Sequence, residues 1–445
     1  MSQLPLPDSQ THDTQAGNRG LPRRTLLGGM LAAGTGLTLT NPTRADAAAA
    51  RPIEFNVWDR APKFRTGWTT GSTIDGRGGL VIGTALKGFS YTDPHTRKKR
   101  TYDRGEWVSP LITPSFKFTE LITSINASTP SGTWVDLSVQ GLTASGRWTR
   151  WLVMGRWTSG DGSNDIRRTS LDGQVDGNVK INTDTLMTTS GETMINYKVR
   201  VRLFRPAGAG TTPRIGLVSA MASAIPKTSS VPTSASGGAW GWVLNVPTYS
   251  QELHKGHYPQ YDGGGEAWCS PTSTAMVIDY WRHGPKTSEL SWVKVSGENR
   301  RQVDHAARNT YDYEYGGTGN WPFNTAYAGK QGLRAYVTRL KSLREAEWFI
   351  RARVPLIVSV SFSSSQLDGA GYSTNGHLLV IVGFTKSGDV IVNDPASHLK
   401  KSDAQVRTTY KRSQFENVWQ TTSGGVTYVM APWGHTLPGP GPNFA

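Results

Sequence analysis

The hydrophobic pattern of this chain changes near its middle. From about residue 51 to residue 218, apolar and polar residues alternate in short runs, such as 133–139 and 197–203, between clusters of Gly, Pro, Asn, Asp and Ser. Alternation of this kind is typical of strands with one buried face. Many short strands with frequent turns predict an antiparallel β-sandwich or jelly roll, which we expect to be an accessory domain.

Residues 219–239 lose the alternation and most of the charge. They read SAMASAIPKTSSVPTSASGGA, which is rich in the small and Pro residues of linkers. A chain of 445 residues is also longer than one hydrophobic core usually accommodates. We therefore predict a sandwich domain over 51–218, a linker over 219–239 and a second domain over 240–445.

In the second domain, helical patterns come first and strand patterns follow. A helix is predicted just after Cys269, with Ser270 as its N-cap and Pro271 at the first helical position. Further helices are expected over 300–309, 322–331 and 342–351, the last with the capping box Ser342-x-x-Glu345, and strands over 356–362, 377–384 and 390–393. This order predicts an α+β domain.

The first 47 residues have the features of an export signal. The pair Arg23-Arg24 precedes an apolar run over 26–39, and Ala45-Asp46-Ala47 follows as a small-x-small cleavage site. Twin arginines indicate a Tat-type signal peptide. The apolar run contains four glycines and is shorter than the roughly 20 apolar residues that span a bilayer. We expect a secreted protein without a stable membrane anchor.

The formal net charge of +15 favours anionic partners such as cell-wall polymers. The basic residues are widely spread and are not gathered into a tract with interleaved aromatics, so we expect no nucleic-acid partner. Four tryptophans of the first domain could stack on sugars, but core packing is the expectation for such large aromatics. They are Trp134, Trp148, Trp151 and Trp157.

Cys269 is the only cysteine of the chain, so no intramolecular disulfide can form. One interpretation is a buried cysteine that acts as a small hydrophobic residue. The other is a nucleophile, because a thiol at the start of a helix meets unsatisfied backbone N–H groups that favour the thiolate. The preceding glycines, 263–265, allow a tight turn and a close approach of substrate.

Thiolate catalysis also needs a base, a group that orients the base, and donors for the oxyanion. His377 begins an apolar strand pattern and Asp394 ends the next one. Gln251 precedes the cysteine and carries a side-chain amide that can donate to an oxyanion. Each of these residues, taken alone, also has a structural interpretation.

Four segments occur in a fixed order over most of residues 240–433: VPTYSQ, EAWCSPTSTAMVIDYW, GHLLVIVGF and VIVNDPA. They resemble the papain-like cysteine peptidases related to the bacteriocin leader-processing family, family thirty-nine of clan CA. The resemblance implies that Gln251 helps to form the oxyanion hole, Cys269 attacks, His377 is the base and Asp394 orients it.

The chain differs from this family at two points. Ser270 stands where the family usually has glycine after the cysteine. The bacteriocin-processing members are fused to membrane transporters, whereas this chain carries a sandwich domain. Cleavage after a double-glycine leader is therefore not implied.

The strand register raises a geometric question about Asp394. If residues 386–389 close a regular hairpin, Asp394 lies opposite the region of Ile381 and not opposite His377, some four residues or about 13 Å away along the strand. A catalytic pair then requires either a β-bulge or a fold-back of residues 393–395, and we predict one of the two. Asn393 is the alternative group to orient His377.

Four side chains around the cysteine loop are of metal-ligating types: His254, His257, Asp262 and Glu266. Their spacing is irregular, and no second cluster supports them. We interpret them as the lining of a cleft and predict no metal and no cofactor.

Together these features predict a secreted cysteine peptidase that hydrolyses amide bonds of a peptide or protein substrate, including one associated with the cell wall. One alternative is an inactive module that binds peptides or cell wall. Another is an acyl transferase of the transglutaminase or amidase type. The sequence does not define the cleavage specificity, the ligand of the first domain or the oligomeric state.

Overall fold

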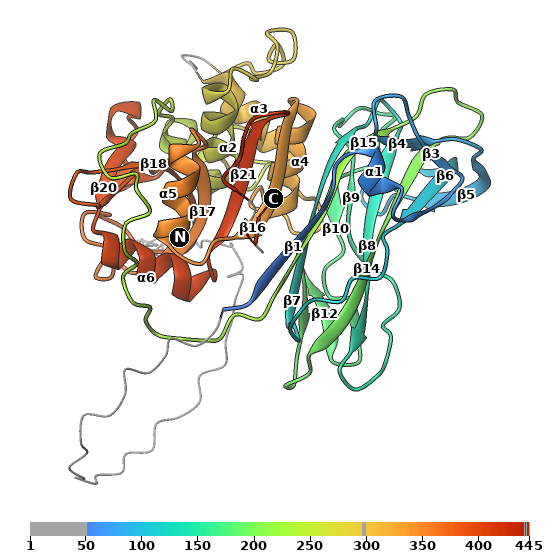
Figure 1. Cartoon of the computed structure of the whole chain (residues 1–445). Coiled ribbons are helices and arrows are strands. Elements are labelled where there is room, and N and C mark those ends of the chain that lie inside the picture. The colour runs from blue at the N-terminus through green and yellow to red at the C-terminus, as the bar shows by residue number, and fades with distance from the viewer. Residues whose placement is uncertain (1–50, 296–299, 440, 442, 445) are drawn as a thin grey trace, which may run out of the picture.

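The computed structural model describes residues 51–295, 300–439, 441 and 443–444. The predicted export signal, with Arg23-Arg24 and the cleavage site at 45–47, lies outside the described residues. Figure 1 shows a β body, blue to green, beside a body of helices and strands, yellow to red. The predicted fold class, a β-sandwich followed by an α+β domain, is confirmed. Among the described helices, none is long and apolar enough to cross a membrane.

The first domain is a sandwich of two antiparallel sheets. One sheet has the order β11-β12-β13-β7-β15-β4-β3, with β1 also on β15, and the other has the order β10-β9-β8-β14-β6-β2, with β5 also on β6. The first consists of β1 (Ile53–Trp58), β3 (Ser72–Ile74), β4 (Leu80–Ile82), β7 (Glu120–Ser128), β11 (Val175–Asp176), β12 (Val179–Asn182), β13 (Thr185–Thr188) and β15 (Arg214–Ser223). The second consists of β2 (Trp68–Thr70), β5 (Leu86–Thr92), β6 (Lys99–Val108), β8 (Trp134–Thr143), β9 (Leu152–Trp157), β10 (Thr169–Ser170) and β14 (Met194–Pro206); a short helix, α1 (Ala61–Phe64), follows β1.

The alternation in the sequence corresponds to the two faces of these strands. In β14, Val199, Val201 and Leu203 are buried. Arg202, between them, faces the other side and bonds Asp136, its cross-strand partner on β8, at 2.7 Å. One face of the strand thus enters the core while the other carries paired charges.

The four tryptophans do not form one surface. Trp134 and Trp157 are buried, and the ring of Trp134 stacks on that of Phe204 with centroids 3.7 Å apart. Trp148 is 38% exposed and carries the Lys198 ammonium over its ring. Trp151 carries the guanidinium of Arg200. The expectation of core packing is confirmed for Trp134 and Trp157.

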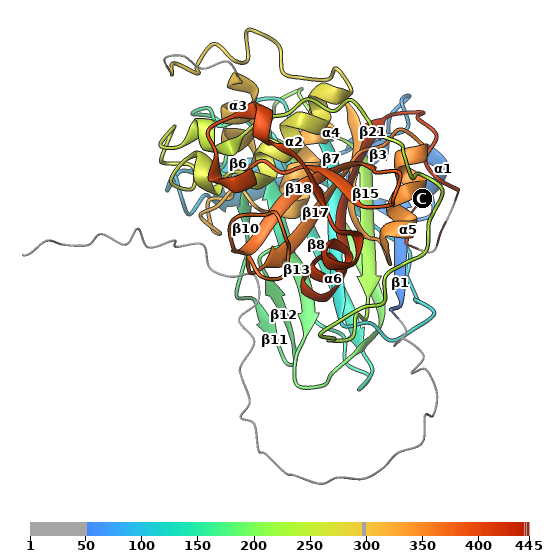
Figure 2. The same cartoon turned by 90° about the vertical axis from the view of Figure 1, so that its left-hand side faces the viewer.

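The second domain is built on a six-stranded antiparallel sheet of order β16-β21-β17-β18-β19-β20. Figure 1 shows α4 beside the sandwich, α2 farther from it, and α5 and α6 beside β17. Figure 2 shows the same domain from the side away from the sandwich. The helices are α2 (Cys269–Tyr280), α3 (Arg301–Thr310), α4 (Trp321–Lys330), α5 (Leu343–Arg351) and α6 (Arg412–Thr422), with short 3-10 turns η1 (Gln251–His254), η2 (Gly265–Ala267), η3 (Ser397–Leu399) and η4 (Asp403–Gln405). The strands are β16 (Leu333–Arg339), β17 (Leu356–Phe362), β18 (Thr374–Phe384), β19 (Val390–Asn393), β20 (Arg407–Tyr410) and β21 (Val426–Pro432).

Two helix starts differ from the prediction. Ser270 is not an N-cap: α2 already begins at Cys269 with Trp268 as its N-cap, because the η2 turn leads directly into the helix. At α5, Ser342 is the N-cap but makes no side-chain cap bond. Glu345 instead accepts from the backbone N–H of Lys341 and from Asn443, so the predicted capping box is wrong.

The sandwich extends five residues into the predicted linker. Residues 219–223 belong to β15, where they pair with both β1 and β7, so a linker start at residue 219 is wrong. The strand is buried there on both faces, and a doubly buried strand shows no polar alternation. The rest of the segment is held by glutamates of the second domain: Glu347 accepts from Gly237 and Ala239, and Glu416 accepts from Ser234.

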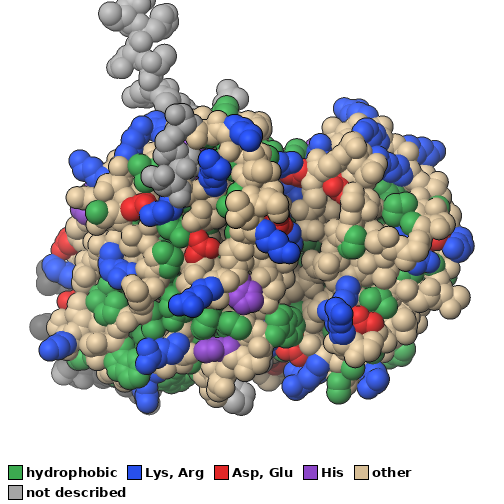
Figure 3. Space-filling model, turned by 90° about the horizontal axis from the view of Figure 1, so that it is seen from above, with side chains coloured by type: hydrophobic (Ala, Val, Ile, Leu, Met, Phe, Trp, Pro, Cys, Tyr) green, Lys and Arg blue, Asp and Glu red, His purple; other side chains and the backbone are tan. Residues whose placement is uncertain are grey.

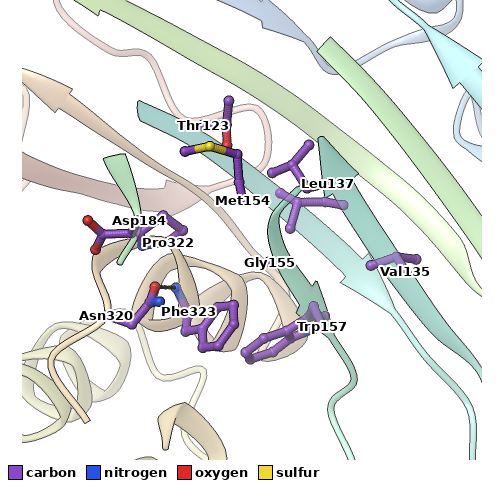
Figure 4. A pocket seen from close by; sticks show the side chains of 11 residues that line it. Thr123, Val135, Leu137, Met154, Gly155, Trp157, Asp184, Asn320, Pro322 and Phe323 are labelled. Carbon is purple, nitrogen blue, oxygen red and sulfur yellow. Dashed lines mark hydrogen bonds between the residues drawn. The ribbon is translucent and has the colours of Figure 1, made fainter. Parts of the chain in front are cut away.

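The two domains share one hydrophobic core. Asn126 of β7 exchanges two hydrogen bonds with the backbone of Ala335 in β16, at 2.8 and 3.0 Å. Figure 4 shows Phe323 of α4 beside Trp157 in a small apolar pocket bordered by β8 and β9. Seen from above, the surface is hollowed between the two domains, and basic side chains are scattered over that face (Figure 3). The sandwich therefore buttresses the face of the second domain that carries α4.

Candidate active site

Cys269 is the first residue of α2 and is half-buried. The helix is fixed to β18 by Ser273, whose hydroxyl donates to the backbone oxygen of Leu378 at 3.0 Å. Leu378 directly follows His377, so this bond joins the helix that carries the thiol to the strand that carries the imidazole. The interaction with Cys269 is among the causes that raise the pKa of the His377 ring.

His377 contacts Asp394 on its other side. Its Nε2 lies 2.8 Å from Oδ1 of Asp394, and both side chains are buried. With Nε2 occupied, Nδ1 is the ring nitrogen that remains for the thiol. The three side chains form a chain from sulfur through imidazole to carboxylate, an arrangement typical of activated nucleophiles.

A β-bulge brings Asp394 to the correct face of the sheet. The β18–β19 hairpin begins with Phe384 opposite Val390 but continues with Val380 opposite Asn393, so one residue is inserted in β18. This register sets Asp394 opposite Leu379, on the same face as His377 and diagonal to it. The unshifted register would place it opposite Val380, on the other face. The predicted bulge is confirmed.

The bulge coincides with a crossing segment. Gly383 pairs with Val243, the N–H of Phe384 donates to the oxygen of Trp242, and the N–H of Leu244 donates to the oxygen of Val382. A Cβ on Gly383 would lie 2.2 Å from the Trp242 oxygen. Only glycine lets the two backbones approach this closely.

Asp394 accepts hydrogen bonds from four groups. Besides His377 these are the hydroxyls of Tyr410 at 2.7 Å and Tyr372 at 2.9 Å and the backbone N–H of Ala396 at 3.0 Å. Burial alone raises the pKa of Asp394, but the charge and hydrogen bonds of His377, with those of the two tyrosines, hold it below its ordinary value. Burial and the adjacent Asp394 charge raise the pKa of both tyrosines, so they remain O–H donors.

The same contacts make His377 strongly basic. Burial by itself lowers the pKa of the imidazole, but the charge and hydrogen bond of Asp394, followed by the interaction with Cys269, raise it to about 10. The site therefore favours the protonated form of the His377 ring. A cation beside the sulfur favours the thiolate, which is the nucleophilic form.

Gln251 lies at the start of η1, next to the loop that precedes Cys269. Its Nε2 donates to the backbone oxygen of Glu266 at 2.8 Å, and its backbone N–H donates to the oxygen of Pro395. Gly265 is required for this packing, because a Cβ there would lie 2.3 Å from the Gln251 oxygen. Gln251 is thus bonded to the cysteine loop through its side-chain amide and to the Asp394 loop through its backbone N–H.

Glu252, the next residue, was not identified from the sequence. Its side chain is only 6% exposed, and its Oε1 lies 3.4 Å from Nε2 of Gln251. Burial raises the pKa of this carboxyl, and the negative charge of Glu266 raises it further, while Lys255 and His377 act in the opposite direction. A buried carboxyl group with a raised pKa, next to a candidate oxyanion donor, is typical of functional sites.

Two residues near the triad have structural roles. Asn393, the alternative orienting group, donates to the backbone oxygens of Val246 and Pro247 and accepts from Arg407, so it holds the segment that leads to Gln251 and does not contact His377. That alternative is wrong. The hydroxyl of Ser270 lies 3.1 Å from that of Tyr428, inside the domain, which explains how serine fits where the family has glycine.

The four side chains considered as metal ligands are not brought together. His254 and His257 both contact Asp304 of α3, which the sequence analysis did not single out. Asp262 instead accepts from Thr318, and burial raises the pKa of its carboxyl to about 6. Glu266 faces Gly256 and Lys255.

Comparison with known families covers both domains. Residues 54–223 match the peptidase C39 N-terminal domain, and residues 243–427 match the peptidase C39 like family. The first domain is therefore similar to the N-terminal domain of C39 peptidases, and the second is similar to the C39-like peptidase family. The first match ends at residue 223, where β15 also ends. A search of curated proteins finds no match.

Among solved structures, a protein from Bacillus anthracis described as a C39-like peptidase is 17% identical, covering 43% of this chain and 96% of that one, with a TM-score of 0.24. A carbohydrate-binding module of family 61 in complex with β-1,4-galactotriose is 10% identical over 38% of this chain and 88% of that one, with a TM-score of 0.16. A family 6 module of a marine laminarinase from Zobellia galactanivorans is 11% identical over 38% and 98%, with a TM-score of 0.17. At these TM-scores the likeness carries no argument about function.

Proposed function

We propose that this C39-like protein is an exported cysteine peptidase that hydrolyses amide bonds with Cys269 as its nucleophile. The observation that carries the proposal is the arrangement of half-buried Cys269, buried His377 and buried Asp394, in which Asp394 bonds the imidazole at 2.8 Å and raises its pKa. Export rests on the twin-arginine signal over residues 1–47. The basic net charge favours a substrate on or near an anionic surface such as the cell wall.

The proposed reaction follows from the placement of these groups. The Cys269 thiolate attacks the carbonyl carbon of the scissile amide and forms an S–C bond. The developing oxyanion accepts from the side-chain amide of Gln251 and from a backbone N–H at the start of α2, where helical N–H groups lack partners within the helix. His377 gives its proton to the leaving nitrogen as the C–N bond breaks, which leaves a thioester.

Hydrolysis of the thioester reuses the same residues. Neutral His377 takes a proton from a water molecule as that water attacks the carbonyl carbon. The C–S bond then breaks, and the thiolate–imidazolium pair is restored. Asp394 remains ionised throughout, because three donors besides His377 hold its carboxylate.

The test is a substrate screen with the mature chain, residues 48–445. Peptide libraries, muropeptides and a glutamine peptide with a labelled amine are each incubated with wild type, Cys269→Ala and Cys269→Ser. Cleavage of a peptide by the wild type alone supports the proposal. Amine incorporation without cleavage assigns a transglutaminase-type transferase, and muropeptide cleavage alone assigns a cell-wall amidase. Equal inactivity of all three proteins towards every substrate assigns a binding module.

A further inference from the structure

Two histidines that closely follow Gln251 in the sequence contact an aspartate of α3. His254 is the last residue of η1, His257 follows it by three residues, and Asp304 comes from α3. Nδ1 of His254 lies 3.0 Å from Oδ2 of Asp304, and Nδ1 of His257 lies 3.2 Å from Oδ1. The three ligand atoms all lie within 4.8 Å of one another.

These atoms have the chemistry and spacing of a transition-metal site. Zinc takes imidazole nitrogen and carboxylate oxygen at about 2.0–2.2 Å, so neighbouring ligands of a tetrahedral ion lie about 3.3 Å apart. The two nitrogen–oxygen distances are within a few tenths of an ångström of that value. Imidazole ligands favour zinc and its first-row neighbours over calcium and magnesium, which prefer oxygen.

Burial adds an electrostatic reason for a cation. The side chains of His254 and Asp304 are fully buried, and that of His257 is 17% exposed. The cluster places a carboxylate inside the domain, where charge is costly to bury unless it is compensated. A divalent cation compensates this charge, and the partial exposure of His257 gives the ion a route of entry.

We propose that His254, His257 and Asp304 bind one Zn²⁺ ion in a structural site that fastens η1 to α3. The ion takes no part in amide hydrolysis. It fixes the end of the 3-10 turn that begins at Gln251, so it holds the segment that carries the candidate oxyanion donor. This revises the prediction of a protein without metal, which did not include Asp304 because only the fold brings α3 to this loop.

The same distances also suit a metal-free network in which both rings donate N–H to the carboxylate. Zinc binding separates the two arrangements, and the active-site thiol must be removed first because Cys269 and His377 could themselves hold zinc. The background is therefore Cys269→Ala in the mature chain. His257→Gln and Asp304→Asn remove ligands, and His305→Gln is the matched control. His305 is a buried histidine on the same helix, and its Nδ1 faces the Tyr327 hydroxyl at 2.8 Å.

The measurements are zinc content after dialysis, calorimetric titration with Zn²⁺ and thermal unfolding with and without a chelator. The expected result is one equivalent of zinc and a higher unfolding temperature in the background and in His305→Gln, with affinity at least about 10-fold weaker in His257→Gln and Asp304→Asn. No zinc binding in the background overturns the proposal, as does affinity unchanged in both ligand variants. None of these measurements uses peptide cleavage, so the zinc site and the proposed peptidase activity are tested independently.

Discussion

Two buried carboxyl groups interact with the charge of His377, and their surroundings are opposite in effect. Asp394 accepts from an imidazole, two tyrosine hydroxyls and a backbone N–H, and its pKa is lowered. Glu252 lies 3.4 Å from the Gln251 amide and is repelled by Glu266, and its pKa is raised. Burial raises the pKa of both groups, so the difference comes from neighbouring charges and hydrogen bonds, first among them the charge of His377 beside Asp394 and that of Glu266 near Glu252. The surroundings of Asp394 favour the ionised carboxylate, whereas those of Glu252 disfavour it.

The largest expected effect comes from removing the supporting carboxylate. Asp394→Ala leaves His377 without its partner, so the imidazolium that holds the thiolate is lost. We expect kcat/KM for peptide cleavage to fall about 10³-fold to 10⁴-fold. Asp394→Asn is the matched variant and should retain more activity, because its amide oxygen can still accept from Nε2. Equal activity of Asp394→Ala and wild type would remove Asp394 from the mechanism.

Next to Glu252, the substitution Gln251→Ala removes the proposed oxyanion donor. The expected loss is about 10²-fold to 10³-fold in kcat, with little change in KM, because the bond forms mainly in the transition state. Gln251→Glu, which cannot donate when ionised, should behave like Gln251→Ala. Steady-state kinetics on the best peptide of the screen gives both constants, and a change confined to KM would contradict the oxyanion role.

Stability should respond to the two carboxylates with opposite signs. The pKa of Asp394 is lowered in the fold, so its contribution is present above its unfolded pKa and is lost as the pH falls through the folded value. The pKa of Glu252 is raised, so its ionised form opposes folding at neutral pH.

At pH 7 we therefore expect Asp394→Asn to lower the free energy of unfolding by about 3 kcal/mol and Glu252→Gln to raise it by about 1 kcal/mol. Urea unfolding of the two variants measures both values. If both substitutions changed the free energy of unfolding in the same direction, the contrast between Asp394 and Glu252 would be contradicted.

The smallest expected effect concerns the hydroxyls that hold Asp394. Tyr372→Phe and Tyr410→Phe each remove one hydrogen bond to a charged group, so each should lower the free energy of unfolding by about 1.5 kcal/mol and kcat by roughly 10-fold. Tyr327→Phe is the control, because it loses a buried hydroxyl bonded to His305, away from the site. Its stability should fall without loss of kcat. A control that lost as much activity would show that the tyrosines matter only for stability.

The features that could be predicted from the sequence are those that depend on interactions between residues close together in the chain. The strands over 356–362 and 390–393 and the helix after Cys269 depend on local patterns, and they were found. Glu252, Tyr372, Tyr410 and Asp304 enter the site through contacts between distant segments, so no local pattern marks them. The sequence predicted that either a bulge or a fold-back must bring Asp394 to His377, but it did not give the position of the bulge. That position coincides with the pairing of Gly383 with Val243, 140 residues earlier in the chain.

Other elements were missed because they lack a distinct period. Strand β21 is buried almost throughout, so it shows no regular polar alternation. Strand β16 follows α4 after only two residues, so its short pattern is not separated from that of the helix. Residues 219–223 were assigned to a linker for the same reason. Small residues buried on two faces resemble a linker in composition, and only their pairing with β1 and β7 reveals a strand.

The account rests on a thiolate held by His377, and the alkylation rate of Cys269 measured against pH tests this most directly. Because Cys269 is the only cysteine, iodoacetamide reports on one thiol. Because Asp394 raises the pKa of His377, and a cation beside the sulfur favours the thiolate, we expect fast alkylation of the wild type well below the pH at which a free thiol reacts. In His377→Ala the rate should instead rise with pH towards the titration of a free thiol at about 8.5. Identical pH profiles for the two proteins would contradict the thiolate–imidazolium pair.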